Sequence, residues 1–157
     1  MKALHILLLP ILFCLFSSFA FAQYTSTGPF RYYESPEIDG SSTGTTDLGT
    51  TVTDTSLNRR FHITGVSVLM TDVGNLLTPA TITVGKDASA YNDIVTSTAV
   101  GSVVGKVKFF NLAGDLERLD EGTTVKVKVT VAATALFGSP TCKFKVILVG
   151  YDRLESD

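Results

Sequence analysis

The sequence predicts an all-β fold: an antiparallel β-sandwich of the jelly-roll or Ig-like kind, with about seven or eight strands and an extended N-terminal arm. Two runs within residues 123–152 alternate apolar and polar side chains, which is typical of strands with one buried face. Turn residues such as glycine, proline and asparagine separate the apolar runs along the rest of the chain. No stretch keeps the apolar spacing of a long helix, so a βαβ architecture is not expected.

The first 22 residues have the order of a secretory signal peptide. A cationic start at Lys2 precedes the apolar run Leu4–Phe16, and Ala20-Phe21-Ala22 forms an Ala-x-Ala pattern before Gln23. We expect cleavage after Ala22 and a secreted protein, extracellular or at the cell surface; an uncleaved anchor is the alternative. The apolar run is shorter than the roughly 20 residues of a membrane-spanning helix. No later run reaches that length, so no membrane span is expected after cleavage.

Residues 23–49 are interpreted as an extended arm or linker, and residues 50–157 as the sandwich domain. The arm carries Phe30, Tyr32 and Tyr33 without a helical period, followed by the small polar stretch Asp39–Thr46. These aromatic side chains either pack on their own domain or dock on a neighbouring protein. Thr50–Leu57 is a candidate edge strand.

The strands of the domain follow in quick succession. Between Arg60 and Val73 the alternation changes parity at Thr64-Gly65, which indicates a β-bulge, and Gly74-Asn75 supplies a turn. Further strands are expected at Thr78–Val84, with Ala80, Ile82 and Val84 inward, and around Lys106–Phe110, while Tyr91–Val95 begins an extended or one-turn helical piece.

The last two strands have the most regular alternation. We expect the first to bury Val125, Val127, Val129 and Val131, and the second to bury Cys142, Phe144, Val146 and Leu148. If these strands pair, the lysines between the apolar residues form a small basic patch; otherwise they solvate the sheet and discourage edge aggregation. The lysines are Lys126, Lys128, Lys143 and Lys145.

Charge and motifs exclude several classes of function. The net charge of −2 is small and its signs are interspersed, which argues against a duplex nucleic acid partner. His62 stands alone without an HxH or HxxxH spacing, and no serine lies in a Gly-x-Ser-x-Gly elbow. We therefore expect no catalytic residue, no enzyme and no cofactor. A Cys142–His62 pair or a glycosidase-type carboxylate pair would need tertiary structure to form.

Calcium is a weaker expectation, because two loops supply acidic side chains without the EF-hand spacing. One loop has Asp87 with Asn92 and Asp93. The other contains the calcium candidates Asp115, Glu117, Asp120 and Glu121.

Cys142 has no partner for an intramolecular disulfide once Cys14 leaves with the signal peptide. Its alternation favours a small buried hydrophobe. An exposed thiol that bridges two molecules is the alternative.

Five tyrosines are candidates for a glycan-stacking platform in a chain without tryptophan, but their scatter favours individual packing. They are Tyr24, Tyr32, Tyr33, Tyr91 and Tyr151.

One similarity runs from Arg59 to Tyr151. The segments Phe61–Val68, Ala80–Gly85 and Tyr91–Val95, with Gly122-Thr123 and a closing Val149-Gly150-Tyr151, resemble small β-sandwich surface or decoration proteins of tailed phages and environmental bacteria. The resemblance implies a structural component and carries over no functional residue. The signal peptide departs from the virion pattern and suggests a secreted version.

The sequence thus predicts a secreted, non-enzymatic structural protein, a surface or extracellular assembly subunit. Its partner is another copy, in a homo-oligomer or filament, or another surface protein, and its arm adds a donor strand to the neighbouring protomer. The alternative is a monomeric, lectin-like module that binds glycans. A hydrolase that uses loop carboxylates or Cys142 has the least support.

Overall fold

The computed structural model describes residues 27–48, 59–86, 90–112, 118–119 and 123–154. Within these ranges the chain forms strands, turns and loops and no helix, so no helix there is able to cross a membrane. The strands are β1 (Thr27–Glu34), β2 (Ile38–Asp39), β3 (Gly44–Asp47), β4 (Arg59–Gly74), β5 (Leu76–Thr78), β6 (Thr81–Gly85), β7 (Val95–Ala99), β8 (Val107–Phe110), β9 (Arg118–Leu119), β10 (Lys126–Val131), β11 (Thr134–Ala135) and β12 (Thr141–Leu154).

The strands pair antiparallel in three sheets. The largest sheet has the order β1-β12-β4-β8, with β2 on β12 and β9 on β4; the second has the order β3-β10-β6-β7, and β11 pairs with β5. The two larger sheets share one hydrophobic core, to which β12 and β4 contribute Phe144, Val146 and Val68, and β10 and β6 contribute Val127 and Ile82. This arrangement fits a sandwich.

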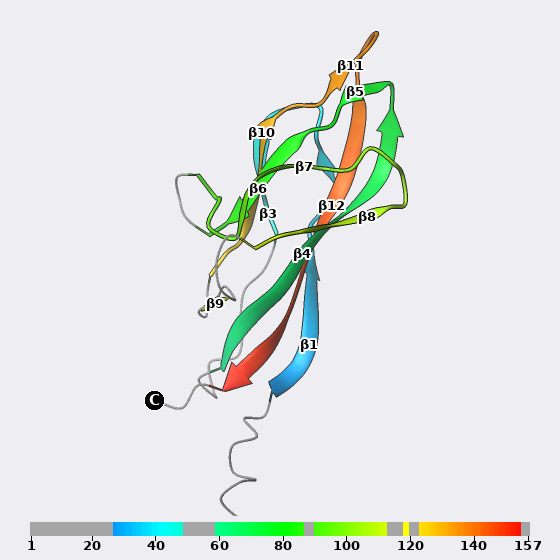
Figure 1. Cartoon of the computed structure of the whole chain (residues 1–157). Helices are drawn as coiled ribbons and strands as arrows, with labels where there is room; N and C mark the ends of the chain where they lie inside the picture. Colours follow the sequence, from blue (N-terminus) through cyan, green and yellow to red (C-terminus); the bar gives the residue numbers. More distant parts are fainter. Residues whose placement is uncertain (1–26, 49–58, 87–89, 113–117, 120–122, 155–157) are drawn as a thin grey trace, which may run out of the picture.

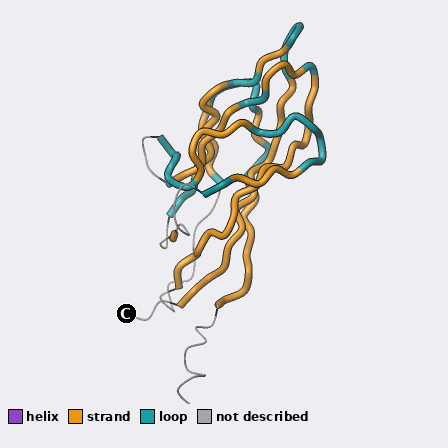
Figure 2. Tube along the Cα trace, viewed as in Figure 1, coloured by secondary structure: helices purple, strands orange, loops and turns teal. Residues whose placement is uncertain are grey.

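Long strands carry the larger sheet beyond the sandwich. β4 and β12 pair continuously from Gly74–Thr141 to Arg59–Leu154, and their lower halves run with β1 past the four-stranded sheet (Figures 1 and 2). In this extension Phe61 and Leu119 are fully buried. The Tyr33 ring on β1 meets the Phe61 ring edge-on, with 5.1 Å between the centroids.

Several sequence predictions are confirmed. The β4–β12 register skips Thr64 between Ile63 and Gly65, which is the predicted bulge. The chain turns after Gly74 at Asn75, whose φ is 50°. The inward residues of β12 and β6, and Ala80 just before β6, are buried as expected: Cys142, Phe144, Val146, Leu148, Ala80, Ile82 and Val84.

One prediction about the last strands needs correction. Val131 was expected inside with the other valines of β10, but it is 56% exposed, because the β10–β6 register shifts between Val129 and Val131 and turns the side chain outward. Strands β10 and β12 do not pair and lie in the two different sheets, so the condition stated for a patch of four lysines is not met.

The finer fold predictions stay predictions. The described residues hold twelve strand segments, some of only two residues, so the predicted strand count is not confirmed. The jelly-roll or Ig-like assignment is not established either. The predicted edge strand at 50–57 and the start of the arm at 23–26 lie outside the described residues.

The described part of the predicted arm pairs within its own chain. β1 and β2 lie on β12, and β3 lies on β10. The arm therefore belongs to both sheets of this protomer.

Candidate assembly surface

The side of the largest sheet that faces away from the core carries a row of apolar side chains, which we call the outer face. Directly paired residues of an antiparallel sheet share a face. Phe30 pairs with Tyr151 and Tyr32 with Val149, so these four side chains lie together on β1 and β12. On the other half of the sheet Ile147 pairs with Ser67, which pairs with Phe109, and Leu69 pairs with Val107. The outer face comprises Phe30, Tyr32, Leu69, Val107, Phe109, Ile147, Val149 and Tyr151.

Three aromatic side chains of the outer face are largely in water. Phe30 is 75% exposed, Tyr32 71% and Phe109 77%. They stand at the two edges of the sheet, since Phe30 and Tyr32 are on β1 and Phe109 is on β8. Contiguous exposed apolar surface of this kind marks interaction sites more often than it occurs on an inert monomer.

Charged groups border the outer face in pairs. Lys145 Nζ lies 2.6 Å from Glu34 Oε1, and Lys143 Nζ lies 3.4 Å from Glu37 Oε1. The hydrogen bond and the attraction of Glu34 raise the pKa of Lys145. The two pairs join the end of β1 and the segment that follows it to β12.

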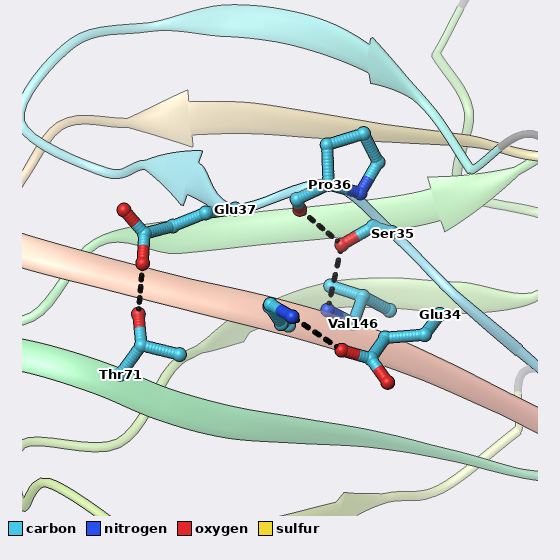
Figure 3. Close-up of polar contacts among 7 residues, drawn as sticks. Glu34, Ser35, Pro36, Glu37, Thr71 and Val146 are labelled. Carbon is cyan, nitrogen blue, oxygen red and sulfur yellow. Dashed lines mark hydrogen bonds and ion pairs between the residues drawn. The ribbon is translucent and has the colours of Figure 1, made fainter.

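Ser35 fastens the end of β1 to β12 from the buried side. The Ser35 N–H donates to the Val146 carbonyl at 2.9 Å, and the Val146 N–H donates to Ser35 Oγ, also at 2.9 Å. The Ser35 hydroxyl itself donates to the Pro36 carbonyl at 2.7 Å (Figure 3). Next to it, the Thr71 hydroxyl donates to Glu37 at 3.0 Å, so β4 also holds this segment.

An ion pair also holds β1 on this buried side. Arg31 Nε lies 2.9 Å from Asp152 Oδ2, and the Asp152 side chain is only 4% exposed. On the outer side the Phe30 ring contacts the Tyr151 ring edge-on at 5.9 Å, and the Tyr151 ring stacks on His62 at 5.6 Å. Strand β1 is therefore held on both faces.

A second group of exposed apolar side chains lies at the far end of the molecule, near β5 and β11 at the top of Figure 1. Leu77 is 55% exposed, Leu136 59% and Phe137 76%. We call these three residues the tip. Within residues 74–80 and 134–141 no side chain carries a charge.

The predicted arm aromatics divide between the two sides of β1. Tyr33 packs inward on Phe61, whereas Phe30 and Tyr32 point outward. Sequence reasoning missed Phe109 and the tip. The adjacent pair Phe109-Phe110 held a usable signal, because neighbouring residues of a strand face opposite ways and only Phe110 is buried.

Two further residues from the sequence analysis, His62 and Cys142, lie on β4 and β12. His62 lies on the face opposite Phe61 and Ile63, where it is buried and its ring stacks on the Tyr151 ring. Cys142 is a fully buried free thiol, and burial raises its pKa, so a bridge between molecules at this thiol would require the sheet to open. The part of the chain that the structure describes contains no group of three or more His, Cys, Asp or Glu side chains able to hold a metal ion.

Of the calcium candidates the structure describes Asn92 and Asp93. Asp115, Glu117, Asp120, Glu121 and Asp87 lie outside the described residues. In the second loop Asp93 Oδ1 accepts the Lys86 N–H at 2.8 Å. Asp39 accepts the Ser41 N–H at 2.8 Å, and the Ser41 hydrogen bonds lower the pKa of that carboxyl.

Comparison with known proteins adds little to this geometry. No protein-family model matches the chain, and a search of the curated proteins finds no match. Among solved structures the chain is similar to one described as "Cyanophage Pam1 capsid asymmetric unit", with a TM-score of 0.49 and 21% identity over 82% of this chain and 88% of that chain. A TM-score below 0.5 establishes neither a shared fold nor a shared function.

Proposed function

We propose that this chain is a secreted, non-enzymatic structural protein that assembles with copies of itself at the cell surface or outside the cell. The observation that supports this most is the outer face, where Phe30, Tyr32 and Phe109 are each more than two-thirds exposed on one side of a well-packed sheet. Such surface is costly in water, and burial against another protein removes it.

Sedimentation velocity and electron microscopy of the purified protein over a range of concentrations test the assembly. We expect dimers or larger particles at micromolar concentration. A protein that stays monomeric up to about 1 mM, the weak end of specific association, would contradict the proposed function.

A finer form of the proposal is that β1 is exchanged between protomers. β1 is an edge strand with a defined register on β12, and the same hydrogen bonds and ion pairs form whether β1 comes from its own chain or from a neighbour. This is the donor-strand arrangement that the arm suggested.

A zero-length cross-link distinguishes the two origins of β1. A carbodiimide couples Lys145 to Glu34, whose charged atoms are 2.6 Å apart. Proteins labelled with ¹⁴N and ¹⁵N are unfolded together, refolded and cross-linked. We expect some cross-linked pairs to join a ¹⁴N peptide to a ¹⁵N peptide, because β1 then comes from the neighbouring chain. If the protein assembles but every cross-linked pair of peptides carries a single isotope, β1 stays in its own chain.

Glycan binding is the second candidate function, because Tyr32 and Tyr151 lie on adjacent strands of the outer face. Exposed tyrosines on one face can stack on sugar rings. A glycan array probed with the monomer, with and without a calcium chelator, tests it, and silence across the array under both conditions removes it.

A further inference from the structure

We infer that the outer face is the contact surface of a twofold dimer, in which a second copy of this chain lays its own outer face on the first. The inference rests on the proposed self-assembly and names the surface that performs it. Three properties of the outer face identify a second copy as its partner: its charge, its exposed area and the placement of its aromatic side chains.

The charge of the outer face suits an identical partner. Two ion pairs on this side of the sheet lie within one chain, Glu34 with Lys145 and Glu37 with Lys143. Because these four charges are already paired in each protomer, a second copy adds no unpaired charge at these positions.

The exposed apolar surface is large enough for a stable dimer. Large aromatic side chains bury about 150–250 Å² each, so three that are roughly three-quarters exposed offer about 350–550 Å². The partly exposed Ile147, Val149 and Tyr151 between them, with Leu69 and Val107, extend the same surface. The total approaches the roughly 800 Å² per partner of a standard interface.

The placement of the aromatic side chains favours one orientation. Phe30 and Tyr32 stand on the edge strand β1, and Phe109 stands on the opposite edge strand β8. A twofold axis parallel to the strands places β1 of one copy over β8 of the other. Phe109 shares a cross-strand row with Ile147 and Tyr32 shares one with Val149, so Phe109 of one copy lies about two residues, or roughly 7 Å, along the strand from Tyr32 of the other, twice over. Two sheets stacked in this way lie about 10 Å apart with strands roughly aligned, as in a sandwich core. The contact is closed and yields a dimer.

Matched phenylalanine variants test the surface. Phe109 and Phe137 are 77% and 76% exposed, but only Phe109 is on the outer face. We expect Phe109→Ser and Tyr32→Ser to raise the dimer Kd by about 30-fold or more, the effect of losing an interface hot spot, and Phe137→Ser to leave it unchanged. Sedimentation equilibrium gives the Kd, and circular dichroism confirms the fold of each variant.

A measurement on the unchanged protein covers the case in which a variant does not fold. Hydroxyl-radical footprinting over a dilution series is expected to show Phe30, Tyr32 and Phe109 protected at high concentration and reactive on dilution, with Phe137 equally reactive throughout. Dissociation by Phe137→Ser alone, or protection of Phe137 alone, would overturn the outer-face dimer and leave self-assembly standing. A monomer at every concentration would overturn both.

Cross-linking tests the axis. Cysteines introduced by Tyr32→Cys and Phe109→Cys in separate proteins are expected to couple through a short bis-maleimide when the two proteins are mixed, and not in either protein alone. The native Cys142 is fully buried and does not compete. Coupling between two molecules of the Tyr32→Cys variant would place β1 over β1 and overturn the proposed orientation.

Discussion

At the scale of single residues, two glycines on neighbouring strands show how differently one residue type is constrained. A Cβ at Gly150 would lie 2.2 Å from the His62 carbonyl oxygen and 2.5 Å from Phe61 Cζ, whereas a Cβ at Gly65 would meet nothing within 4 Å. Gly150 lets the backbones of β12 and β4 approach where the sheet bends at the Thr64 bulge.

Substitution by alanine separates the two glycines. We expect Gly150→Ala to lower the free energy of unfolding by about 3 kcal/mol or more, because backbone has to move to admit the methyl group. Gly65→Ala is expected to change it by less than about 1 kcal/mol, in the stabilising direction, through the unfolded chain. Urea denaturation measures both, and equal losses would contradict the contact geometry.

The Asp39 carboxylate provides a second residue-scale prediction. The Ser41 side chain and N–H hold the pKa of Asp39 below its ordinary value, with a smaller contribution from Lys143. A lowered pKa in the folded state means that this group stabilises the fold above the unfolded-state pKa, and that the stabilisation is lost as the pH falls through the folded-state pKa.

Removal of the Ser41 hydroxyl tests this cause. We expect Ser41→Ala to raise the pKa of Asp39 without restoring its ordinary value, since the Ser41 N–H still donates at 2.8 Å. An NMR titration of the Asp39 carboxyl carbon measures the change. Ser42→Ala, at the adjacent exposed serine, is the control and is expected to leave the pKa where it is.

At the scale of elements, strand β1 depends on the buried side chain that follows it. Ser35 is 3% exposed and accepts the Val146 N–H, so Ser35→Ala leaves that buried donor without its partner. We expect a loss of about 1–2 kcal/mol in the free energy of unfolding and faster hydrogen exchange along β1.

Thr64 supplies the matched control for this prediction. Its hydroxyl likewise makes a hydrogen bond to β12, here as the donor to the Val149 carbonyl at 3.2 Å, but Thr64 is exposed. Water replaces an exposed hydrogen bond, so Thr64→Ala is expected to cost less than about 0.5 kcal/mol. Equal effects of the two variants would show that burial at Ser35 does not decide the outcome.

At the scale of the whole molecule, assembly ties stability to concentration. A partner that binds only the folded protein stabilises it by mass action. We expect a roughly hundredfold rise in protein concentration to raise the apparent Tm by several degrees. Differential scanning calorimetry measures the shift, and an invariant Tm would contradict self-assembly.

Much of the architecture was predictable from local pattern. The bulge at Thr64-Gly65, the turn at Asn75 and the inward face of β12 follow from alternation and turn chemistry, which act between neighbours in sequence. Val131 was predicted wrongly because the β10–β6 register shift depends on a strand nearly fifty residues away. The candidate surface was predictable only through Phe30 and Tyr32.

The sequence by itself therefore determined an all-β chain and which side chains of most strands share a face, because side-chain alternation is a property of the extended backbone. Only the tertiary structure decided that β10 and β12 lie in opposite sheets and that β1 and β8 are the edges of one sheet. Strand partners are chosen by long-range hydrogen bonding and by burial of both inner faces together, which no local pattern encodes. That choice brings Phe30 and Tyr32 onto one face with Phe109, and with it creates the outer face.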